Sequence, residues 1–415
     1  MSNLEILRRV YLDYNATTYL EADVLQEIHR ALETAWGNPS SSYKAGKDAK
    51  EIINTARSHV AEMVGGQSDD IIFTSGGTEA NNMVFHTVLK YFKDVFPSVD
   101  NGTVQSRPHI ITSNMEHDSV KLPLEHFVKE GIIDVTYISA SKLTGMVNVD
   151  DVIAAIRPTT CLITIMMANN ETGIIQPISE ISKRVKSITR NEKDEVKQIL
   201  LHTDAAQAIG KIPVDVQELE VDYLTIVGHK FYGPRIGALY VRGPGKDTPL
   251  HPMFFGGGQE RNFRPGTENT GMIAGLGKAA ELVVKHLPSY QNHMREIRDY
   301  LESRLQDVFD DRIHFNGRFT GSHRIPNTCN VSIKGPKLKG YKILECVKHL
   351  EASVGAACHS ENRCQPSHIL LSIGIPWDIA STALRLSTGR HTTKEDIDIV
   401  IEDLKQAVSL LEESM

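Results

Sequence analysis

Residues 221–234 read Val-Asp-Tyr-Leu-Thr-Ile-Val-Gly-His-Lys-Phe-Tyr-Gly-Pro. The first seven residues have the apolar, β-branched composition of a buried strand, and Gly228 ends it. Lys230 therefore stands at a strand end, with a Gly-Pro turn behind it. A lysine held in this way has a fixed stem and a poorly hydrated ammonium, so its neutral amine can form a Schiff base. An ordinary surface lysine fits the same local pattern, and the motifs upstream decide between the two.

A phosphate cradle is predicted at residues 71–81. Residues 71–75 read as a buried strand that runs into Gly76-Gly77-Thr78-Glu79 and then an apolar-periodic helix. Backbone donors at a helix N-terminus would hold a phosphate there, although a Gly-Gly turn before a helix is weak support by itself. An electron-sink cofactor such as pyridoxal phosphate needs a lysine and a phosphate cradle. It also needs an acid facing its pyridine nitrogen, a group on the ring face and a donor to its phenolate oxygen.

Asp204 is the candidate acid. It ends the apolar strand 200–204, where a carboxylate is costly unless it meets a cation, and a protonated pyridine nitrogen is such a cation. Ala-Ala-Gln-Ala follows it, so Asp204 could instead be the N-cap of a helix. The two roles are compatible.

Two more polar residues follow predicted strands. His117 comes after the strand 109–112 and is placed to lie against a planar ring, and Asn170 ends the strand 161–167 and could donate to a phenolate oxygen. A strand-end hydrogen bond for His117 and an ordinary loop for Asn170 are the local alternatives. An open α/β sheet gathers such strand-end groups on one edge, so together they favour a single site.

At this point the chain resembles the class V aminotransferase group of pyridoxal phosphate enzymes, and within it the cysteine desulfurases and selenocysteine lyases. The resemblance covers nearly the whole chain in the right order. It rests on the motifs YLDYNATT (11–18), GNPSS (37–41), GGTE (76–79), EH (116–117), NNETG (169–173), DAAQ (204–207), GHK (228–230) and RPGT (264–267).

The resemblance implies a fold-type I homodimer in which Lys230 carries pyridoxal 5'-phosphate as a Schiff base, Asp204 faces the pyridine nitrogen and His117 stacks on the ring. Its implied phosphate ligands are Gly77, Thr78, His229 and Thr267 of the partner subunit. Gln207 and Asn170 address the phenolate oxygen, and Asn38, Asp118 and Arg385 serve the substrate. Val227 stands where many desulfurases have a serine, so one hydroxyl contact to the phosphate is missing.

Residues 352–367 are small and polar, as in a loop, and carry Cys358 and Cys364. The other cysteines, 161, 329 and 346, are most simply buried apolar side chains. A disulfide, or a metal site with His359, is an alternative for the loop, but one Cys-x5-Cys pair lacks the ligands of a convincing zinc site. By family position Cys358 is the catalytic cysteine that meets the substrate's sulfur or selenium, and the role of Cys364 is open.

Arg385 lies in Ala-Leu-Arg-Leu-Ser, where it alternates with Leu384 and Leu386 and points away from their face. A guanidinium fork is a natural partner for an amino-acid carboxylate. Spacing alone leaves an ion pair within the protein equally open, and the resemblance favours the substrate.

At 415 residues the chain should form two domains. We expect a large α/β domain with a mostly parallel mixed sheet over 18–288 and a small α+β domain over 289–415, with 1–17 packed against it. A net charge of −7 with both signs spread along the chain argues against nucleic acid. No run is apolar enough to span a membrane, the N-terminus lacks a secretory apolar region, and cysteines are few, so we expect no membrane partner and a cytosolic enzyme.

The resemblance leaves two reactions open. One is release of selenium from L-selenocysteine, giving L-alanine, and the other is the cysteine desulfurase reaction, giving L-alanine and an enzyme persulfide. Three features favour the first, with a selenium-accepting protein as an expected partner. The chain ends without a long Trp-containing tail, and residues 254–263 and 354–360 look most like vertebrate-type selenocysteine lyases. Asp118 stands where scaffold-docking desulfurases have lysine, and a carboxylate there would disfavour a thiolate more than a readily ionised selenol. A catalytically retired homologue should have lost Lys230 or Cys358, and both are present.

Overall fold

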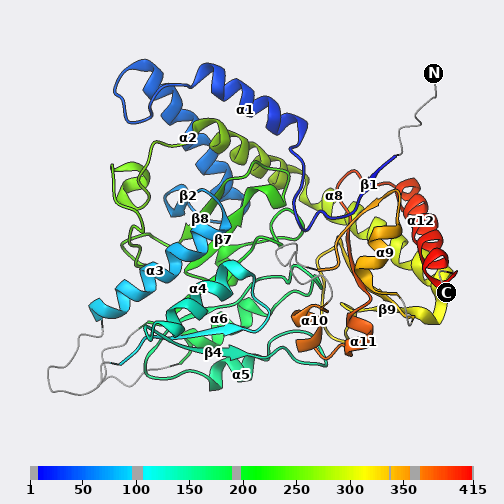
Figure 1. Ribbon diagram of the computed structural model, residues 1–415. Coiled ribbons are helices and arrows are strands. Elements are labelled where there is room, and N and C mark those ends of the chain that lie inside the picture. The colour runs from blue at the N-terminus through cyan, green and yellow to red at the C-terminus, as the bar shows by residue number, and fades with distance from the viewer. Residues whose placement is uncertain (1–7, 96–105, 189–197, 336–337, 356–364, 414–415) are drawn as a thin grey trace.

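The computed structural model describes residues 8–95, 106–188, 198–335, 338–355 and 365–413 (Figure 1). Its main element is a seven-stranded sheet of order β2-β8-β7-β6-β5-β3-β4. The strands are Ile71–Thr74 (β2), Gly237–Val241 (β8), Tyr223–Val227 (β7), Leu200–Asp204 (β6), Thr160–Thr164 (β5), His109–Ser113 (β3) and Asp134–Ile138 (β4). Only β8 runs against its neighbours, so the sheet is mixed but mostly parallel, as predicted.

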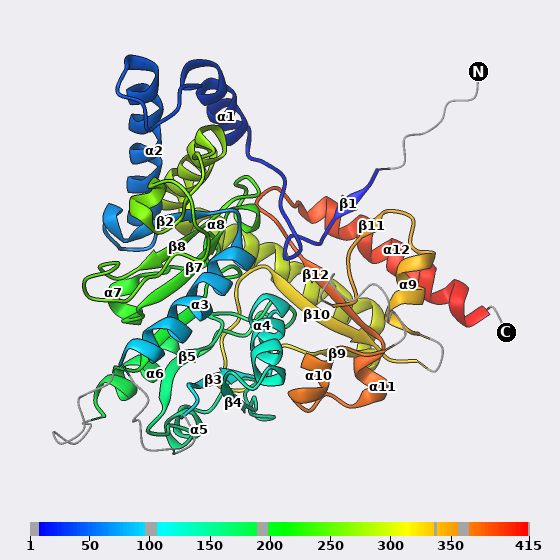
Figure 2. The same cartoon turned by 60° about the vertical axis from the view of Figure 1, so that its left-hand side comes forward.

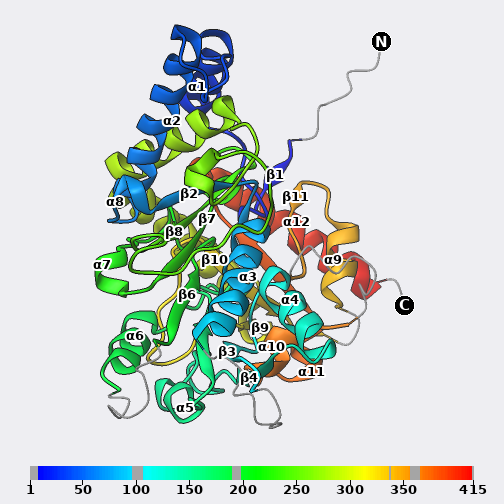
Figure 3. The same cartoon turned by 90° about the vertical axis from the view of Figure 1, so that its left-hand side faces the viewer.

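Helices cover both faces of this sheet because successive side chains of a strand point to opposite faces. Ile72 and Leu200 pack with α3 (Gly77–Val95) and α4 (Asp118–Lys129), which lie side by side in Figure 3. Ile71 and Leu201 belong to the core on the other face, with α2 (Lys44–Met63), α6 (Ile178–Lys186) and the first half of α8 (Thr270–Phe309). Apolar residues at consecutive positions therefore fill two separate cores.

A second, antiparallel sheet has the order β12-β10-β9 and consists of Ala383–Ser387 (β12), Thr328–Ile333 (β10) and Ile313–Phe315 (β9). The second half of α8 and α12 (Lys394–Glu413) pack with it in a core of its own. Val10 and Leu12 enter this core, because β1 (Val10–Tyr11) pairs in parallel with β11 (Leu350–Glu351), beside which it lies in Figure 2. The first described residues thus pack with the last third of the chain.

The helix α8 joins the two parts. It has 40 residues and so is about 60 Å long. Ile273 to Val283 lie in the core of the large sheet, whereas Ile297 to Phe309 lie in the core of the small sheet. One continuous element therefore fixes the spacing of the two sheets.

The remaining helices are short or peripheral: α1 (Ala22–Thr34), α5 (Val149–Ala154), α7 (Val216–Leu219), α9 (Gly340–Cys346), α10 (His368–Ser372) and α11 (Trp377–Ala380), with 3-10 turns at Ser68–Asp70, Gly228–Lys230, Gln259–Asn262 and Asp310–Arg312. Within the described ranges, no helix has the length and apolar character needed to cross a membrane.

Candidate active site

The carboxyl ends of β2, β3, β5, β6 and β7 meet at one edge of the large sheet, because β2 runs antiparallel to β8 and β8 antiparallel to β7. A cavity of about 250 Å³ lies there. The residues predicted from the sequence that line it are Gly77, Thr78, His117, Asn170, Asp204, Gln207, Val227, His229, Lys230 and Arg385. The structure therefore brings together side chains that are up to 308 positions apart.

Lys230 lies in the 3-10 turn that follows β7. Its Nζ donates to the backbone carbonyls of Asn15 (2.8 Å) and Ala16 (2.7 Å). Gly228 makes this turn possible, because an added Cβ would lie 2.5 Å from the carbonyl oxygen of Pro234. The amine is half-buried and is held by neutral oxygens from the N-terminal segment.

Asp204 is anchored by neutral donors. Its Oδ1 accepts from the N–H of Ala206 (3.0 Å) and its Oδ2 from Nδ2 of Asn81 (2.9 Å). No helix follows, since residues 206–211 form turns, so the N-cap alternative is not realised. Within the described residues no Lys or Arg side chain forms an ion pair with Asp204, and this buried carboxylate retains its capacity to meet a cation in the cavity.

Asn81 connects Asp204 to the histidine at the cavity wall. Its Nδ2 also donates to Oγ of Ser119 (2.8 Å), and Nδ1 of His117 accepts from the N–H of Ser119 (3.1 Å). His117 is the N-cap of α4, whereas Asp118 occupies the first helical position. The cap fixes the plane of the imidazole and turns Nδ1 away from the cavity contents.

The phosphate cradle has the expected shape but lacks a hydroxyl. Gly77 opens α3, and an added Cβ there would lie 2.6 Å from Cγ2 of Val227. The methyl of Val227 thus occupies the space beside the cradle. Burial and the adjacent Lys230 lower the pKa of His229 to about 4, so its imidazole is neutral near pH 7. Its Nδ1 lies 3.1 Å from Oγ1 of Thr17.

The two asparagines of the Asn-Asn turn have different tasks. Oδ1 of Asn169 accepts from the N–H groups of Glu171 (3.0 Å) and Thr172 (2.9 Å) and so builds the turn. Oδ1 of Asn170 is buried at the cavity wall without a hydrogen-bond partner. The amide of Asn170 is therefore free to address a group within the cavity.

Arg385 lies on β12 and reaches the cavity from the small sheet with 2% of its side chain exposed. Its Nη2 donates to Oδ1 of Asp13 (2.7 Å) and its Nη1 to the carbonyl of Asn170 (3.2 Å), while Nε has no hydrogen-bond partner. The intramolecular ion pair considered from the sequence therefore exists, and it leaves part of the guanidinium fork available.

Some predicted site residues lie elsewhere. Asn38 is exposed in the turn between α1 and α2, where its Oδ1 accepts from the N–H of Ser40 (3.0 Å). Thr267 lines a separate cavity of about 180 Å³, and Asp118 does not line the large-sheet cavity. Cys358 and Cys364 lie outside the described residues.

The sequence reasoning missed other cavity residues: Asn15, Ala16, Ser119, Met166, Ala168 and Ala206. Asn15 and Ala16 belong to the quoted motif at 11–18, which was the available signal. The other four residues lie within three residues of a predicted site residue or strand end, so proximity to strand ends was their signal.

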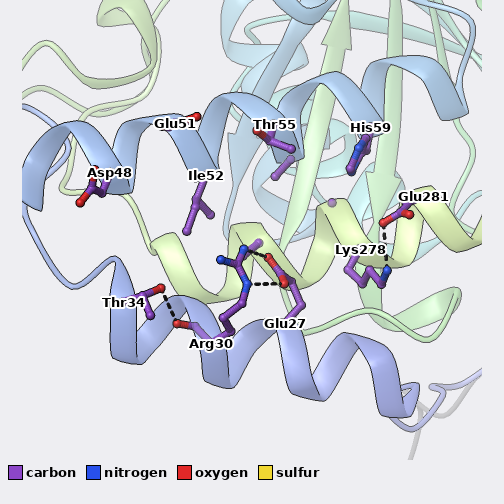
Figure 4. A pocket seen from close by; sticks show the side chains of 13 residues that line it. Glu27, Arg30, Thr34, Asp48, Glu51, Ile52, Thr55, His59, Lys278 and Glu281 are labelled. Carbon is purple, nitrogen blue, oxygen red and sulfur yellow. Dashed lines mark hydrogen bonds and ion pairs between the residues drawn. The ribbon is translucent and has the colours of Figure 1, made fainter.

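A wider cavity of about 440 Å³ lies between α1, α2 and α8 (Figure 4). Its charged side chains largely pair with one another, as in Arg30 with Glu27 (2.6 Å) and Lys278 with Glu281 (3.1 Å). It contains none of the predicted site residues, whereas the smaller cavity contains most of them.

These features define an α/β enzyme in which a lysine, an acid and a histidine meet in one cavity at the strand ends. The chain belongs to the aminotransferase class-V family, whose model matches residues 10–400. Enzymes of this family depend on pyridoxal phosphate.

Individual members of the family to which the chain is similar include both selenocysteine lyases and cysteine desulfurases. A protein of Rattus norvegicus called selenocysteine lyase is 59% identical over 98% of this chain and 95% of its own length. A cysteine desulfurase IscS of Dictyoglomus turgidum is 40% identical over 97% of this chain and 95% of its own length. A solved structure called NifS-like protein has a TM-score of 0.83 and 32% identity, covering 97% of this chain and all (100%) of the other.

The cavity fits pyridoxal phosphate on observations of this chain alone. The buried carboxylate of Asp204 has neutral donors, the amide oxygen of Asn170 has no partner, and Gly77 leaves the cradle open. A cationic ring nitrogen, a ring substituent that donates or accepts hydrogen bonds, and a phosphate satisfy these three features in turn.

Glu116 gives a test of the site's framework. Its carboxyl accepts from Oγ of Ser113 (2.6 Å) and from the N–H of Met166 (3.0 Å), which ties the ends of β3 and β5 together beside His117. Burial raises the pKa of this carboxyl to about 8.

Glu116→Gln should make stability less dependent on pH. A raised folded-state pKa means that the wild type is stabilised fully below the usual glutamate pKa of about 4.3 and loses this contribution as the pH rises through 8. We measure the melting of both proteins without cofactor at several pH values. Between pH 5 and pH 8.5 the free energy of unfolding of the variant should rise relative to that of the wild type by at least about 1 kcal/mol. Parallel curves would show that Glu116 is ionised throughout.

Proposed function

We propose that this protein releases selenium from L-selenocysteine and forms L-alanine. The observation that carries the proposal is the 59% identity to the rat selenocysteine lyase, against 40% to the cysteine desulfurase. Selenium leaves at the elemental oxidation level, or as selenide where a thiol reduces it. The alternative is a cysteine desulfurase that forms L-alanine and an enzyme persulfide, which the presence of Cys358 favours.

Pyridoxal phosphate, when bound, supplies an electron sink for the α-carbon of an amino acid. Residues of this chain proposed to hold it are Gly77 and Thr78 at the N-terminus of α3, with neutral His229, for the phosphate. Asp204 would hold the ring nitrogen, His117 the ring face, and Asn170 and Gln207 the phenolate oxygen. Each of these side chains lines the cavity.

Lys230 is proposed as the cofactor's covalent anchor and as the base that moves the α-proton. Its Nζ is already held by the carbonyls of Asn15 and Ala16, which accept hydrogen bonds and so keep the amine directed at the cavity.

Arg385 is proposed to bind the carboxylate of the substrate. Its guanidinium is buried and its Nε is unpartnered, so a carboxylate that reaches it gains a charge-assisted hydrogen bond away from water. Asp13 holds Nη2 and thereby fixes the plane of the fork.

Cys358 is proposed as the residue that meets the departing selenium or sulfur, and Cys364 has no assigned role. Asp118 is proposed to favour selenocysteine over cysteine. It stands one residue from His117 at the first position of α4, where a negative charge disfavours a neighbouring thiolate.

We propose a cytosolic homodimer whose chain divides into domains at 18–288 and 289–415, with 1–17 packed on the second. Asn38 and Thr267 do not line the cavity of their own chain, so their proposed roles require a second chain. Exposed apolar side chains near these loops, namely Trp36, Tyr43 and Phe255, support such an interface. A selenium-accepting protein is a further proposed partner.

The reaction can be tested by measuring alanine released from selenocysteine and from cysteine separately. Selenocysteine should be the far better substrate by kcat/KM. Lys230→Ala should abolish release from both, and borohydride should fix the cofactor to residue 230 only in the wild type. Faster turnover of cysteine would favour the desulfurase alternative, and full activity of Lys230→Ala would remove the assignment of this site.

Arg385→Ala should raise KM for selenocysteine steeply, because an unpaired carboxylate in a closed site costs roughly 2–5 kcal/mol. Arg385→Lys keeps the positive charge but loses the two-pronged guanidinium, so its KM should lie between those of the wild type and Arg385→Ala. Steady-state kinetics of all three proteins provide the measurement. Unchanged KM and kcat in Arg385→Ala would leave Arg385 only its structural ion pair with Asp13.

Asp118→Lys should raise turnover of cysteine relative to selenocysteine several-fold, since a shift of one unit in a thiol pKa is worth about 1.4 kcal/mol. Asp118→Asn, which keeps the shape, should give a smaller change in the same direction. Since His117 and not Asp118 caps α4, the loss of stability should stay within about 1 kcal/mol. An unaltered kcat/KM ratio with a lowered melting point would rule out the selectivity role.

A further inference from the structure

Beneath the cavity lies a second lysine that the mechanism above does not use. Lys211 follows the turns after β6 and has 3% of its surface exposed. Its Nζ donates to Oε1 of Gln207 (2.7 Å) and to Oδ1 of Asn15 (3.2 Å). Both acceptors line the cavity, whereas Lys211 itself does not.

The electrostatic surroundings of this ammonium are unfavourable. The charged groups that face it are Lys230 from the turn after β7, Arg385 from β12 and Arg390 from the turn before α12, all of the same sign. In the described part of the chain, no carboxylate lies within ion-pair distance of its Nζ. Burial and these cations lower its pKa well below the ordinary value. Burying an ammonium without a carboxylate partner costs free energy, so packing alone does not account for a lysine here.

The hydrogen bonds of Lys211 set the direction of two amides. Because Oε1 of Gln207 accepts from Lys211, its Nε2 must face the other way, where it donates to the carbonyl of Asn15 (3.0 Å) and faces the cavity. Without Lys211, no hydrogen bond on that side would fix whether the oxygen or the nitrogen of the Gln207 amide faces the cavity.

Asn15 is fixed in the same manner. Its Oδ1 accepts from Lys211 and from Nδ2 of Asn327 (3.0 Å), which leaves its Nδ2 to donate to Oγ1 of Thr328 (2.8 Å). The backbone carbonyl of Asn15 then accepts from Nζ of Lys230 (2.8 Å). Lys211 thus reaches the amine of Lys230 through one intervening residue.

We propose that Lys211 is a positioning residue that orients the amide of Gln207 and the carbonyl of Asn15, and through them the amine of Lys230. This deepens the proposed function and rests on it for the identity of the cofactor. Removing Lys211 withdraws a hydrogen-bond donor from the side chain of Asn15 and from Gln207, which both contact the carbonyl that binds Lys230. With fewer competing donors around it, this carbonyl stabilises the protonated amine better, and the pKa of Lys230 should rise.

The experiment compares Lys211→Met, Lys211→Gln and, as a matched control on α8, Lys278→Met. Reductive methylation of cofactor-free protein, followed by mass spectrometry of the peptide with residue 230, gives the pH midpoint of the amine. We expect an upward shift of about one pH unit in Lys211→Met. Lys211→Gln reaches only one of the two acceptors and should shift by about half as much. Lys278→Met should show no shift.

In the holoenzyme, the pH midpoint of the visible absorbance should move in the same direction. The kcat of Lys211→Met should fall by at least about tenfold with KM within about threefold, since alignment and not substrate affinity is lost. An unmoved amine midpoint, or a lowered melting temperature with unchanged spectra, would overturn the proposal. If Lys211→Met does not fold, the half-shift of Lys211→Gln is decisive. The methylation result does not depend on the substrate, so a failure of the selenocysteine assignment is distinguishable from a failure here.

Discussion

The backbone and side chain of Asn15 form the contact on which the rest of the site depends. Its carbonyl accepts from Lys230, its N–H donates to Oγ of Ser387 on β12 (3.0 Å), and its Nδ2 donates to Thr328 on β10. One residue therefore ties the lysine turn of the large sheet to the edge strand β12 and the central strand β10 of the small sheet. A displacement of the N-terminal segment would therefore separate Lys230 from Arg385, which line the same cavity.

Local sequence signals predicted the cavity wherever a residue follows a parallel strand. Asp204, His117 and Asn170 each come after an apolar run, and the geometry of a parallel sheet then brings their side chains to a common edge. Even the ambiguity of the Asn-Asn turn has a simple resolution, because Asn169 builds the turn and Asn170 faces the cavity. The helix that was the alternative reading of the residues after Asp204 does not form, since residues 206–211 form turns.

Contacts between distant segments were beyond such reasoning. Arg385 pairs with Asp13, 372 positions away, and Lys211 contacts Asn15. No sequence pattern indicates either contact. The replacement of a serine by Val227 was visible in the sequence, but its physical meaning was not. The structure shows that a methyl of Val227 packs against Gly77. Any side chain at position 77 would collide with this methyl. The two oxygens that accept from Lys211, Oδ1 of Asn15 and Oε1 of Gln207, are likewise brought to it by the fold and are not indicated by the local sequence.

The charges around the cavity are divided between its two ends. At the Asp204 end the supporting groups are neutral, since burial lowers the pKa of His202 to about 4 and raises that of Glu116 to about 8. The carboxylate of Asp204 therefore presents an uncompensated negative charge to the cavity. At the other end, the buried guanidinium of Arg385 carries positive charge and pairs with Asp13. A molecule with a cationic ring nitrogen at one end and a carboxylate at the other is bound in one orientation by this field, and reversal would place like charges together in a buried space.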